Sequence, residues 1–271
     1  MSFCRFVVEP VGKQLREIVL AVQDTAIVTG AARGMGLEIA RKLGSLGHHV
    51  VIVDALKDEL NAASEALQSE GLSVQAIHLD LADDTQIAAL PQRIGDRFER
   101  VAILVNNAGI SPSRNGKKVP APEIELSEWE HVLKVNLTAP FRMMQVCLPP
   151  MRERKWGRIV NISSRAGRSP GGAAGSAYVT SKSGLLGLTR AFAKELGPEG
   201  ITVNAVAPGR IETPMGASSP PDVLAQVLQN IPVGRFGEPS EVAAMVAYLA
   251  SPEAGFVTGA TFDINGGILM I

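Results

Sequence analysis

The stretch Thr25-Ala-Ile-Val-Thr-Gly-Ala-Ala-Arg-Gly-Met-Gly36 combines an apolar run, a glycine-rich turn and the beginning of a helical pattern. Its glycines, Gly30, Gly34 and Gly36, follow the spacing G-x-x-x-G-x-G directly after the predicted strand Thr25–Thr29. Glycine lets the backbone approach a ligand closely, and the free N–H groups of a helix N-terminus attract phosphate. Because the turn joins a strand to a helix, the stretch predicts the first unit of a dinucleotide-binding α/β fold.

Short β-branched runs alternate with longer helical patterns along the rest of the chain. This alternation predicts a single Rossmann-like domain, a doubly wound parallel sheet of about seven strands with helices on both faces. The predicted strands are Thr25–Thr29, His49–Val53, Val74–Leu79, Val101–Val105, Arg158–Ile162, Thr202–Ala205 and Ala260–Ile264. The predicted helices are Gly34–Leu46, Lys57–Ser69, Asp84–Phe98, Ser127–Met151, Ala177–Leu196 and Pro239–Ala250. The segments that follow the strands should surround one crevice, since parallel strands end at the same edge.

We divide the chain into an N-terminal extension of unknown role, residues 1–23, and a dinucleotide-binding catalytic domain, residues 24–271.

The composition and net charge exclude several classes of protein. A net charge of −1 gives no reason to expect a nucleic acid or an anionic membrane as partner. No apolar run approaches the roughly 18 to 20 residues that span a bilayer, and the four histidines lack zinc-type spacing. We therefore expect a cytoplasmic, metal-free protein that acts on a small molecule.

Asp54 lies at the end of the second predicted strand. A carboxylate there can accept hydrogen bonds from the hydroxyls of an adenosine ribose. It would also repel the 2′-phosphate of NADP by on the order of 4 kcal/mol per unit charge at a separation of about 4 Å. Arg33 in the glycine turn has the opposite effect, because a guanidinium can hold a phosphate. The arginine is flexible and can swing into solvent, so we expect NAD, with NADP less favoured; the simpler alternative is a solvated aspartate.

From Asp24 to Gly267 the sequence resembles the short-chain dehydrogenase/reductase family. The matching pieces are Thr29–Gly36, Asp80, Asn106–Gly109, Asn136, Ser164, Tyr178 with Lys182, Pro208-Gly209 and Thr213. Each piece is weak evidence alone, but the ordered set is specific. The resemblance implies a homotetramer of Rossmann-like domains and a catalytic group of Asn136, Ser164, Tyr178 and Lys182.

The resemblance also implies which residues bind the cofactor. Asp80 would contact the adenine, Asn107 the ribose, and the Pro208–Thr213 loop the nicotinamide carboxamide. The full predicted set is Gly30, Arg33, Gly34, Met35, Gly36, Asp54, Asp80, Leu81, Asn107, Ala108, Gly109, Tyr178, Lys182, Pro208, Gly209, Ile211 and Thr213.

Tyr178 and Lys182 are four residues apart in a helical pattern, so their side chains face the same side. A free tyrosine has a pKa near 10 and is a poor base at neutral pH. A nearby ammonium stabilises the phenolate, so we expect Lys182 to lower the pKa of Tyr178 toward the working range. By itself this pair would be read as a surface pair. Its place after Asn161-Ile-Ser-Ser164 favours a proton-transferring role for Tyr178.

Two further residues complete the predicted catalytic group. The resemblance implies that Ser164 hydrogen-bonds the substrate oxygen; Ser163 is the alternative, and Gly171-Gly172 would absorb one extra residue before Tyr178. Asn136 is followed by Pro140, which has no N–H to bond the carbonyl of residue 136, so we expect a kink there. The freed carbonyl can hold a water that leads toward Lys182, as in the family's proton relay. An ordinary proline kink is the alternative.

The substrate is the least determined part. Arg165, Arg168 and Arg210 lie on loops that should ring the reacting centre, and an inward guanidinium would bind an anionic substrate. Solvated loop charges are the alternative. We therefore predict an NAD-dependent oxidoreductase acting on a small polar secondary alcohol or ketone that carries an anion, with Ser164, Arg165 and Arg210 on the substrate. An NADP-dependent carbonyl or 3-oxoacyl reductase is the second hypothesis, and a non-catalytic dinucleotide-binding regulator the third.

Two further patterns bear on the assembly. Gly184 and Gly187 are small residues on the predicted Tyr178 helix, which would let another helix approach closely. The apolar C-terminal segment Ile268–Ile271 indicates a buried end.

Overall fold

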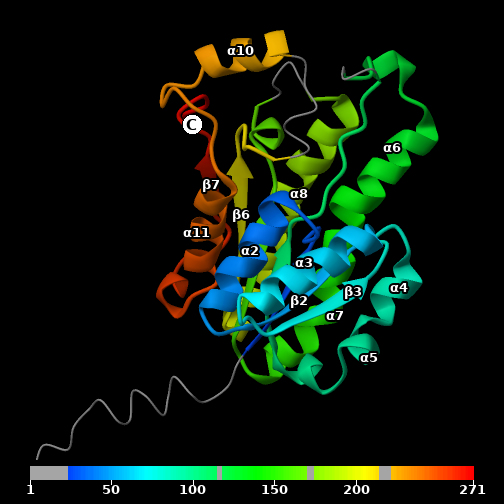
Figure 1. Ribbon diagram of the computed structural model, residues 1–271, viewed down its shortest axis with the longest axis vertical. Coiled ribbons are helices and arrows are strands. Elements are labelled where there is room, and N and C mark those ends of the chain that lie inside the picture. The colour runs from blue at the N-terminus through cyan, green and yellow to red at the C-terminus, as the bar shows by residue number, and fades with distance from the viewer. Residues whose placement is uncertain (1–23, 115–117, 170–173, 214–220) are drawn as a thin grey trace, which may run out of the picture.

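The computed structural model describes residues 24–114, 118–169, 174–213 and 221–271. These residues form one parallel sheet of seven strands in the order β3-β2-β1-β4-β5-β6-β7 (Figure 1). The strands are β1 Thr25–Thr29, β2 His49–Asp54, β3 Val74–His78, β4 Val101–Asn106, β5 Gly157–Ile162, β6 Ile201–Pro208 and β7 Thr261–Ile264. The predicted fold class is confirmed, and the strand order reverses between β1 and β4, where such sheets bind ligands. The predicted extension 1–23 lies outside the described residues.

Helices cover both faces of the sheet, as Figure 1 shows. One face carries α2 Gly34–Ser45, α3 Lys57–Ser69 and α11 Pro239–Leu249. The other carries α4 Asp84–Ala88, α5 Leu90–Ile94, α7 Ala139–Glu153 and α8 Ser176–Leu196. Alternate strand residues enter opposite cores: Val28 and Ile52 pack under α2 and α3, whereas Ile27 and Val51 pack under α7. No helix of the described residues is long and apolar enough to cross a membrane.

The predicted helix Asp84–Phe98 is wrong as a single element. The structure divides it into α4, α5 and the 3-10 helix η1 Gly95–Arg100. Pro91 has no N–H to bond a carbonyl four residues earlier, so α4 cannot continue and α5 begins with this proline near its N-terminus. Gly95 then ends α5 with a left-handed φ of 72°. The helix α10 Pro221–Gln229 was not predicted at all.

The predicted helix Ser127–Met151 is also interrupted. It consists of α6 Leu126–Leu133, the π-helical turn η3 Lys134–Thr138 and α7. The N–H of Ala139 bonds the carbonyl of Lys134, five residues back. The expected kink before Pro140 is therefore a π-helical turn, which widens the helix by one residue where the proline removes a donor. Such turns are frequent at functional sites, and this one contains Asn136.

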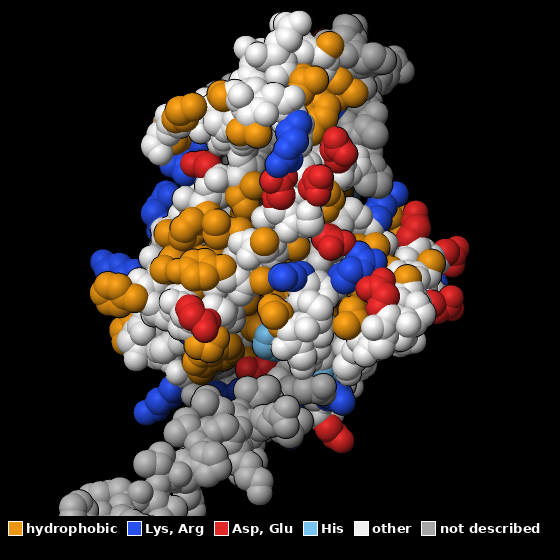
Figure 2. Space-filling model, turned by 60° about the vertical axis from the view of Figure 1, so that its left-hand side comes forward, with side chains coloured by type: hydrophobic (Ala, Val, Ile, Leu, Met, Phe, Trp, Pro, Cys, Tyr) orange, Lys and Arg blue, Asp and Glu red, His pale blue; other side chains and the backbone are white. Residues whose placement is uncertain are grey.

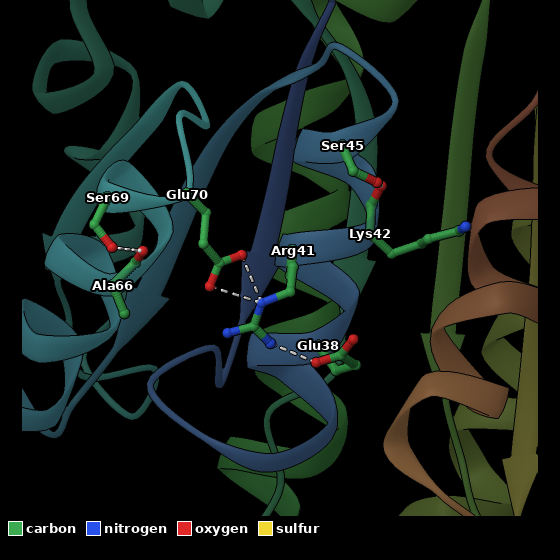
Figure 3. A network of polar contacts seen from close by, with 7 residues as sticks. All are labelled: Glu38, Arg41, Lys42, Ser45, Ala66, Ser69 and Glu70. Atoms are coloured by element: carbon green, nitrogen blue, oxygen red, sulfur yellow. Dashed lines mark hydrogen bonds and ion pairs between the residues drawn. The ribbon is translucent and has the colours of Figure 1, made fainter.

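A surface network fixes α2 against the end of α3. Figure 3 shows the Arg41 guanidinium between the carboxylates of Glu38 and Glu70. The Arg41 Nε atom lies 2.9 Å from Glu70 Oε2, and the hydrogen bond to Glu70 is the main reason that the pKa of Arg41 is raised. Half-exposed ion pairs of this kind contribute little stability singly. Their place matters more, since α2 begins at the glycine turn and must keep its position for the turn to keep its shape.

Candidate active site

The glycine turn between β1 and α2 packs directly on the loop after β4. A Cβ atom on Gly30 would lie 2.7 Å from the Cα atom of Ala108, and one on Gly36 would lie 2.1 Å from the carbonyl oxygen of Gly30. The Asn107 side chain donates from Nδ2 to the carbonyls of Thr29 and Gly30, both at 2.9 Å. These contacts explain why the two positions need glycine: the turn and the loop interlock with no room for a side chain.

A cavity of about 510 Å³ opens at this place, within the usual range of small-molecule sites, roughly 300 to 1,000 Å³. Twelve of the predicted cofactor contacts line it: Gly30, Arg33, Gly34, Met35, Gly36, Asp54, Asp80, Leu81, Asn107, Ala108, Gly109 and Thr213. Tyr178, Lys182, Pro208, Gly209 and Ile211 do not line it. The cavity also contains residues that the sequence analysis missed: Ala55, Leu56, Leu79, Ile110, His131 and Val135. Most of these are apolar and carry no chemical pattern of their own. Only their place after strand ends, on α6 or in η3 could have indicated them.

Asp54 is held at the edge of this cavity by two backbone donors. Its Oδ2 atom accepts from the N–H of Ala32 at 3.0 Å, and its Oδ1 atom accepts from the N–H of Leu56 at 3.1 Å. Arg33 points instead toward α3, where its Nη1 atom lies 3.6 Å from Glu59 Oε1 in an exposed ion pair. The carboxylate is therefore fixed next to the glycine turn, whereas the guanidinium is loosely held at the rim.

Gly109 connects this cavity to the predicted catalytic residues. A Cβ atom on Gly109 would lie 3.1 Å from Lys182 Nζ and 3.4 Å from Asn136 Oδ1. The bare backbone of Gly109 thus separates the cavity from the buried ends of these two side chains. A side chain at position 109 would contact the Lys182 Nζ atom directly.

Lys182 lies on α8 and is buried, with 3% of its surface exposed. Its Nζ atom donates to the carbonyl of Ile162 at 2.7 Å and lies 5.8 Å from the centre of the Tyr178 ring. Burial lowers the pKa of Lys182 to about 8. The ammonium still carries its charge at neutral pH, but in a site where that charge is poorly solvated.

Tyr178 is half-buried on the same face of α8. Burial raises the pKa of its phenol, while a hydrogen bond with Ser164 lowers it. The expectation that Lys182 would bring this pKa below its ordinary value is therefore wrong. The reason is that desolvation of the phenolate outweighs the favourable groups around it. The hydrogen bond places the Ser164 hydroxyl beside the phenol; its predicted bond to a substrate oxygen stays a prediction.

The two neighbouring serines have different surroundings. Ser163 is buried, and its Oγ atom donates to the carbonyl of Lys182 at 2.8 Å. Ser164 is partly exposed, accepts from the N–H of Ala166 at 3.1 Å and hydrogen-bonds Tyr178. Ser163 therefore holds α8 against β5, and Ser164 is the serine whose hydroxyl is available beside the phenol. The Gly171-Gly172 segment, expected to absorb an extra residue, lies outside the described residues.

Asn136 is fully buried in the π-helical turn. Its Oδ1 atom accepts from the N–H of Ile110 at 2.8 Å, and its Nδ2 atom donates to the carbonyl of Ile110 at 2.9 Å and to Ser181 Oγ at 3.1 Å. The side-chain amide is therefore used entirely within the protein. The predicted role of its backbone carbonyl in holding a water stays a prediction.

The loop after β6 is held by two other segments. A Cβ atom on Gly209 would lie 2.8 Å from the Cα atom of Asn265, and the Gly209 N–H donates to the carbonyl of Ile264 at 2.8 Å. Ile211 is buried and pairs with Gly237 in an isolated parallel bridge. This pairing directs the chain toward Thr213, which lines the cavity.

The three arginines expected around the substrate do not share one role. Arg168 forms an ion pair with Asp263 on β7, with 2.6 Å between Nη1 and Oδ2. Its charge is therefore already paired with the edge strand. Arg165 and Arg210 are partly exposed after β5 and β6, and burial lowers the pKa of Arg210.

The residues present fit a nicotinamide dinucleotide. The glycine turn leaves a bare cradle at a helix N-terminus, where phosphates bind. A fixed carboxylate, Asp54, lies where an adenosine ribose would need an acceptor pair. The Gly109 backbone, which lines the cavity, lies next to the Lys182 Nζ atom with no side chain between them. This combination defines the class: a nicotinamide-dependent oxidoreductase on a Rossmann-like sheet.

Comparisons with known proteins agree with this class. The family model described as enoyl-(acyl carrier protein) reductase matches residues 30–269. A 3-oxoacyl-[acyl-carrier-protein] reductase of Aquifex aeolicus is 39% identical over 244 residues, covering 90% of this chain and 96% of the relative. The chain belongs to the short-chain dehydrogenase/reductase family of NAD(P)-dependent oxidoreductases.

Solved structures show the same relationship. A 3-oxoacyl-[acyl-carrier protein] reductase from Brucella melitensis with bound NAD has a TM-score of 0.85 and 36% identity, covering 98% of this chain and 99% of that one. A structure from Beutenbergia cavernae, described as an NAD(P)-dependent gluconate 5-dehydrogenase with bound NADP, has a TM-score of 0.84 and 33% identity. It covers 92% of this chain and 97% of that one.

Proposed function

We propose that the protein reduces the ketone of a 3-oxoacyl thioester, or oxidises the corresponding 3-hydroxyacyl compound, with NAD as the preferred cofactor. The observation that carries the reaction type is the Tyr178–Lys182 pair, with 5.8 Å between the Lys182 Nζ atom and the centre of the ring. This pair lies next to Gly109, which lines the dinucleotide cavity, and Ser164 lies beside the phenol. The acyl substrate is supported by the relatives from Aquifex and Brucella. The proposed reaction is that of the second hypothesis from the sequence, the 3-oxoacyl reductase. The proposed cofactor, NAD, is that of the first hypothesis.

A nicotinamide bound in the cavity would supply the hydride to the carbonyl carbon in reduction, or accept it from the hydroxyl-bearing carbon in oxidation. Tyr178 gives its phenolic proton to the carbonyl oxygen during reduction, or takes it from the hydroxyl during oxidation. Ser164 donates a hydrogen bond to the same oxygen and so fixes its position beside the phenol. Lys182 stabilises the phenolate that reduction leaves behind, because its ammonium is poorly solvated and gains from a negative neighbour. Asn136 holds the segment that carries Gly109 in place.

The raised pKa of Tyr178 fits proton donation from the phenol during reduction of a ketone. A phenol with an elevated pKa stays protonated at neutral pH and is ready to donate, which suits reduction of a ketone. Oxidation of an alcohol needs the phenolate, and a cationic nicotinamide in the cavity would favour it.

A substrate panel tests the proposal. Acetoacetyl-coenzyme A represents the 3-oxoacyl thioesters, 5-ketogluconate represents the anionic polyols, and a neutral cyclic ketone represents substrates without an anionic group. Each is assayed by absorbance of the reduced cofactor with NADH and NADPH in parallel. We expect acetoacetyl-coenzyme A to have the highest kcat/KM and NADH to be the better donor. Turnover of the anionic polyol alone would replace the proposed substrate, and preference for NADPH would overturn the proposed cofactor.

A small anionic alcohol remains the second candidate, because Arg165 and Arg210 follow β5 and β6 at the edge where substrate would enter. The similarity to the Beutenbergia structure also supports it. Within this candidate, one guanidinium would pair with the anion and orient the reacting carbon. The same panel separates it from the first, since a thioester offers no carboxylate next to the reacting ketone.

We also propose that the protein assembles as a homotetramer in the cytoplasm. Figure 2 shows hydrophobic side chains gathered on the face that includes α10 and α11, and exposed apolar residues of the described chain include Val233, Tyr248, Phe256, Met270 and Ile271. The strand β7 is at the edge of the sheet, and such edges favour pairing.

Two details bear on this assembly. Gly184 does not leave room for another copy as the sequence analysis expected, because Leu137 of the same chain fills that space; a Cβ atom there would lie 2.9 Å from it. The neighbouring position of Gly187 is open. The C-terminal Met270 and Ile271 are each 75% exposed in the single chain, which supports burial by a second copy. A sedimentation mass of one chain at micromolar concentration would contradict the assembly.

A further inference from the structure

Ser181, between Tyr178 and Lys182 in sequence, is fully buried. Its Oγ atom donates to the backbone carbonyl of Tyr178 at 2.8 Å. The same oxygen accepts from Asn136 Nδ2 at 3.1 Å. The Ser181 hydroxyl therefore links the segment of α8 that carries Tyr178 and Lys182 to the π-helical turn η3.

The orientation of the Asn136 amide is determined by Ile110, whose N–H and carbonyl it binds at the same time. A reversed amide would set donor against donor and acceptor against acceptor. The second N–H of the Asn136 side-chain amide must then point at the Ser181 Oγ atom, which accepts this hydrogen bond. A continuous chain of hydrogen bonds thus runs from the backbone of Tyr178 through Ser181 and Asn136 to Ile110.

This chain ends beside the cofactor cavity. Ile110 follows Gly109 directly, and both line the cavity. The space at Gly109 is limited by Lys182 Nζ, 3.1 Å from a Cβ atom placed there. The separation between the loop after β4 and the catalytic side of α8 therefore depends on the two hydrogen bonds of Asn136 to Ile110 and on the one to Ser181.

We propose that Ser181 is a positioning residue: it sets the distance between the cofactor-side loop at Gly109 and the helix that carries Tyr178 and Lys182. Ser181 touches neither substrate nor cofactor in this role. The inference rests on the proposed hydride transfer with Tyr178 as the proton-transferring residue, and it is independent of which ketone is reduced. Its loss would leave a buried N–H of Asn136 without an acceptor, so η3 and α8 would no longer be held in one arrangement.

The test compares Ser181→Ala with Thr180→Ala, an exposed neighbour on the same helix. Both are measured with whichever ketone the unmodified protein reduces. Ser181→Ala should lower kcat about tenfold, leave the Kd for NADH within about twofold by fluorescence, and move the apparent pKa in the kcat/KM profile by about half a unit. Thr180→Ala should match the unmodified protein in all three. Circular dichroism at the assay temperature shows that each variant is folded.

A merely structural role predicts a different result. If Ser181→Ala lowers the melting temperature but keeps kcat and the pH profile of the unmodified protein, Ser181 only stabilises the fold and the inference is overturned. If Ser181→Ala does not fold, Ser181→Cys carries the test, since its sulfur is a weaker acceptor; an intermediate fall in kcat with a shifted profile supports the inference, and an unchanged kcat overturns it. Absence of turnover with every ketone in the unmodified protein would instead refute the proposed function.

Discussion

The Asp54 carboxylate accepts a hydrogen bond of 3.0 Å from the backbone N–H of Ala32, so its negative charge is attached to the glycine turn itself. A 2′-phosphate bound at this edge would meet a charge that cannot move away. We expect NAD to exceed NADP by at least about tenfold in kcat/KM, equivalent to about 1.4 kcal/mol. Asp54→Ala should reduce that ratio severalfold by improving NADP. The control is Asp58→Ala, which removes an exposed carboxylate from the first turn of α3; an equal shift in both variants would mean that only overall charge matters.

Tyr178→Phe tests proton transfer. The change removes the phenol oxygen and keeps the ring, so kcat should fall on the order of 10² to 10⁴-fold, while the Kd for NADH stays within about threefold. The chain has one other tyrosine, Tyr248, which is 45% exposed on α11, and Tyr248→Phe is the matched control. Stopped-flow absorbance of the reduced cofactor gives the rate. Normal turnover of the Tyr178→Phe variant would require another proton donor.

Gly109→Ala tests whether cofactor binding depends on the absence of a side chain between the cavity and Lys182. The new methyl group would lie 3.1 Å from the Nζ atom, the movable end of a long side chain, so the fold should tolerate it. Binding of NADH should weaken about tenfold, measured by fluorescence titration. Gly197→Ala adds the same group where nothing lies within 4 Å and should bind NADH normally. Equal binding by both variants would show that the cofactor does not pass Gly109.

The pKa of Lys182 predicts how stability depends on pH. Burial lowers this pKa to about 8 from an ordinary value of 10.5. Between these two values the folded protein has released a proton that the unfolded chain still holds, so the free energy of unfolding rises with pH across this window. Relative to Lys182→Met, the unmodified protein should gain up to about 3 kcal/mol between pH 8 and pH 10.5. Urea unfolding at several pH values measures the difference, and a flat difference would contradict it.

The second substrate candidate has its own test in Arg210. Under that candidate, Arg210→Ala should raise KM for an anionic substrate at least about tenfold, or about 1.4 kcal/mol, and leave a neutral ketone unchanged. Arg165→Ala should have a smaller effect of the same kind. Steady-state kinetics with a matched anionic and neutral pair gives the answer. Normal kinetics for both variants would leave the arginines as loop charges and remove this candidate.

The sequence predicted the strands well because buried parallel strands are apolar along their whole length. A β-branched run such as Val50–Val53 is typical of a buried strand. Each predicted strand overlaps an observed one. Helix interruptions were harder to predict. Pro91 ended a helix that was expected to continue, and the π-helical turn at Asn136 replaced an expected kink. Both errors concern proline, whose effect on a helix depends on which neighbouring groups can replace the lost hydrogen bond.

For the site, residues with a distinctive chemical type were easier to predict than residues that act through position. The glycine turn and Asp54 line the cavity as expected. Apolar cavity residues such as Val135, and the hydrogen-bonding role of Ser181, required the three-dimensional arrangement. The partner of Arg168 could not be predicted either, because Asp263 is ninety-five residues away in sequence.

The contact between the glycine turn and the loop after β4 also limits how this protein can change. Because Gly30 packs on Ala108 and Asn107 binds the carbonyls of Thr29 and Gly30, a larger residue in either segment displaces the other. Substitutions here should be accepted only in compensating pairs, and libraries that vary one segment at a time will be depleted of active members. A redesign of cofactor preference is therefore better directed at the rim, around Arg33 and Asp54, than at the turn.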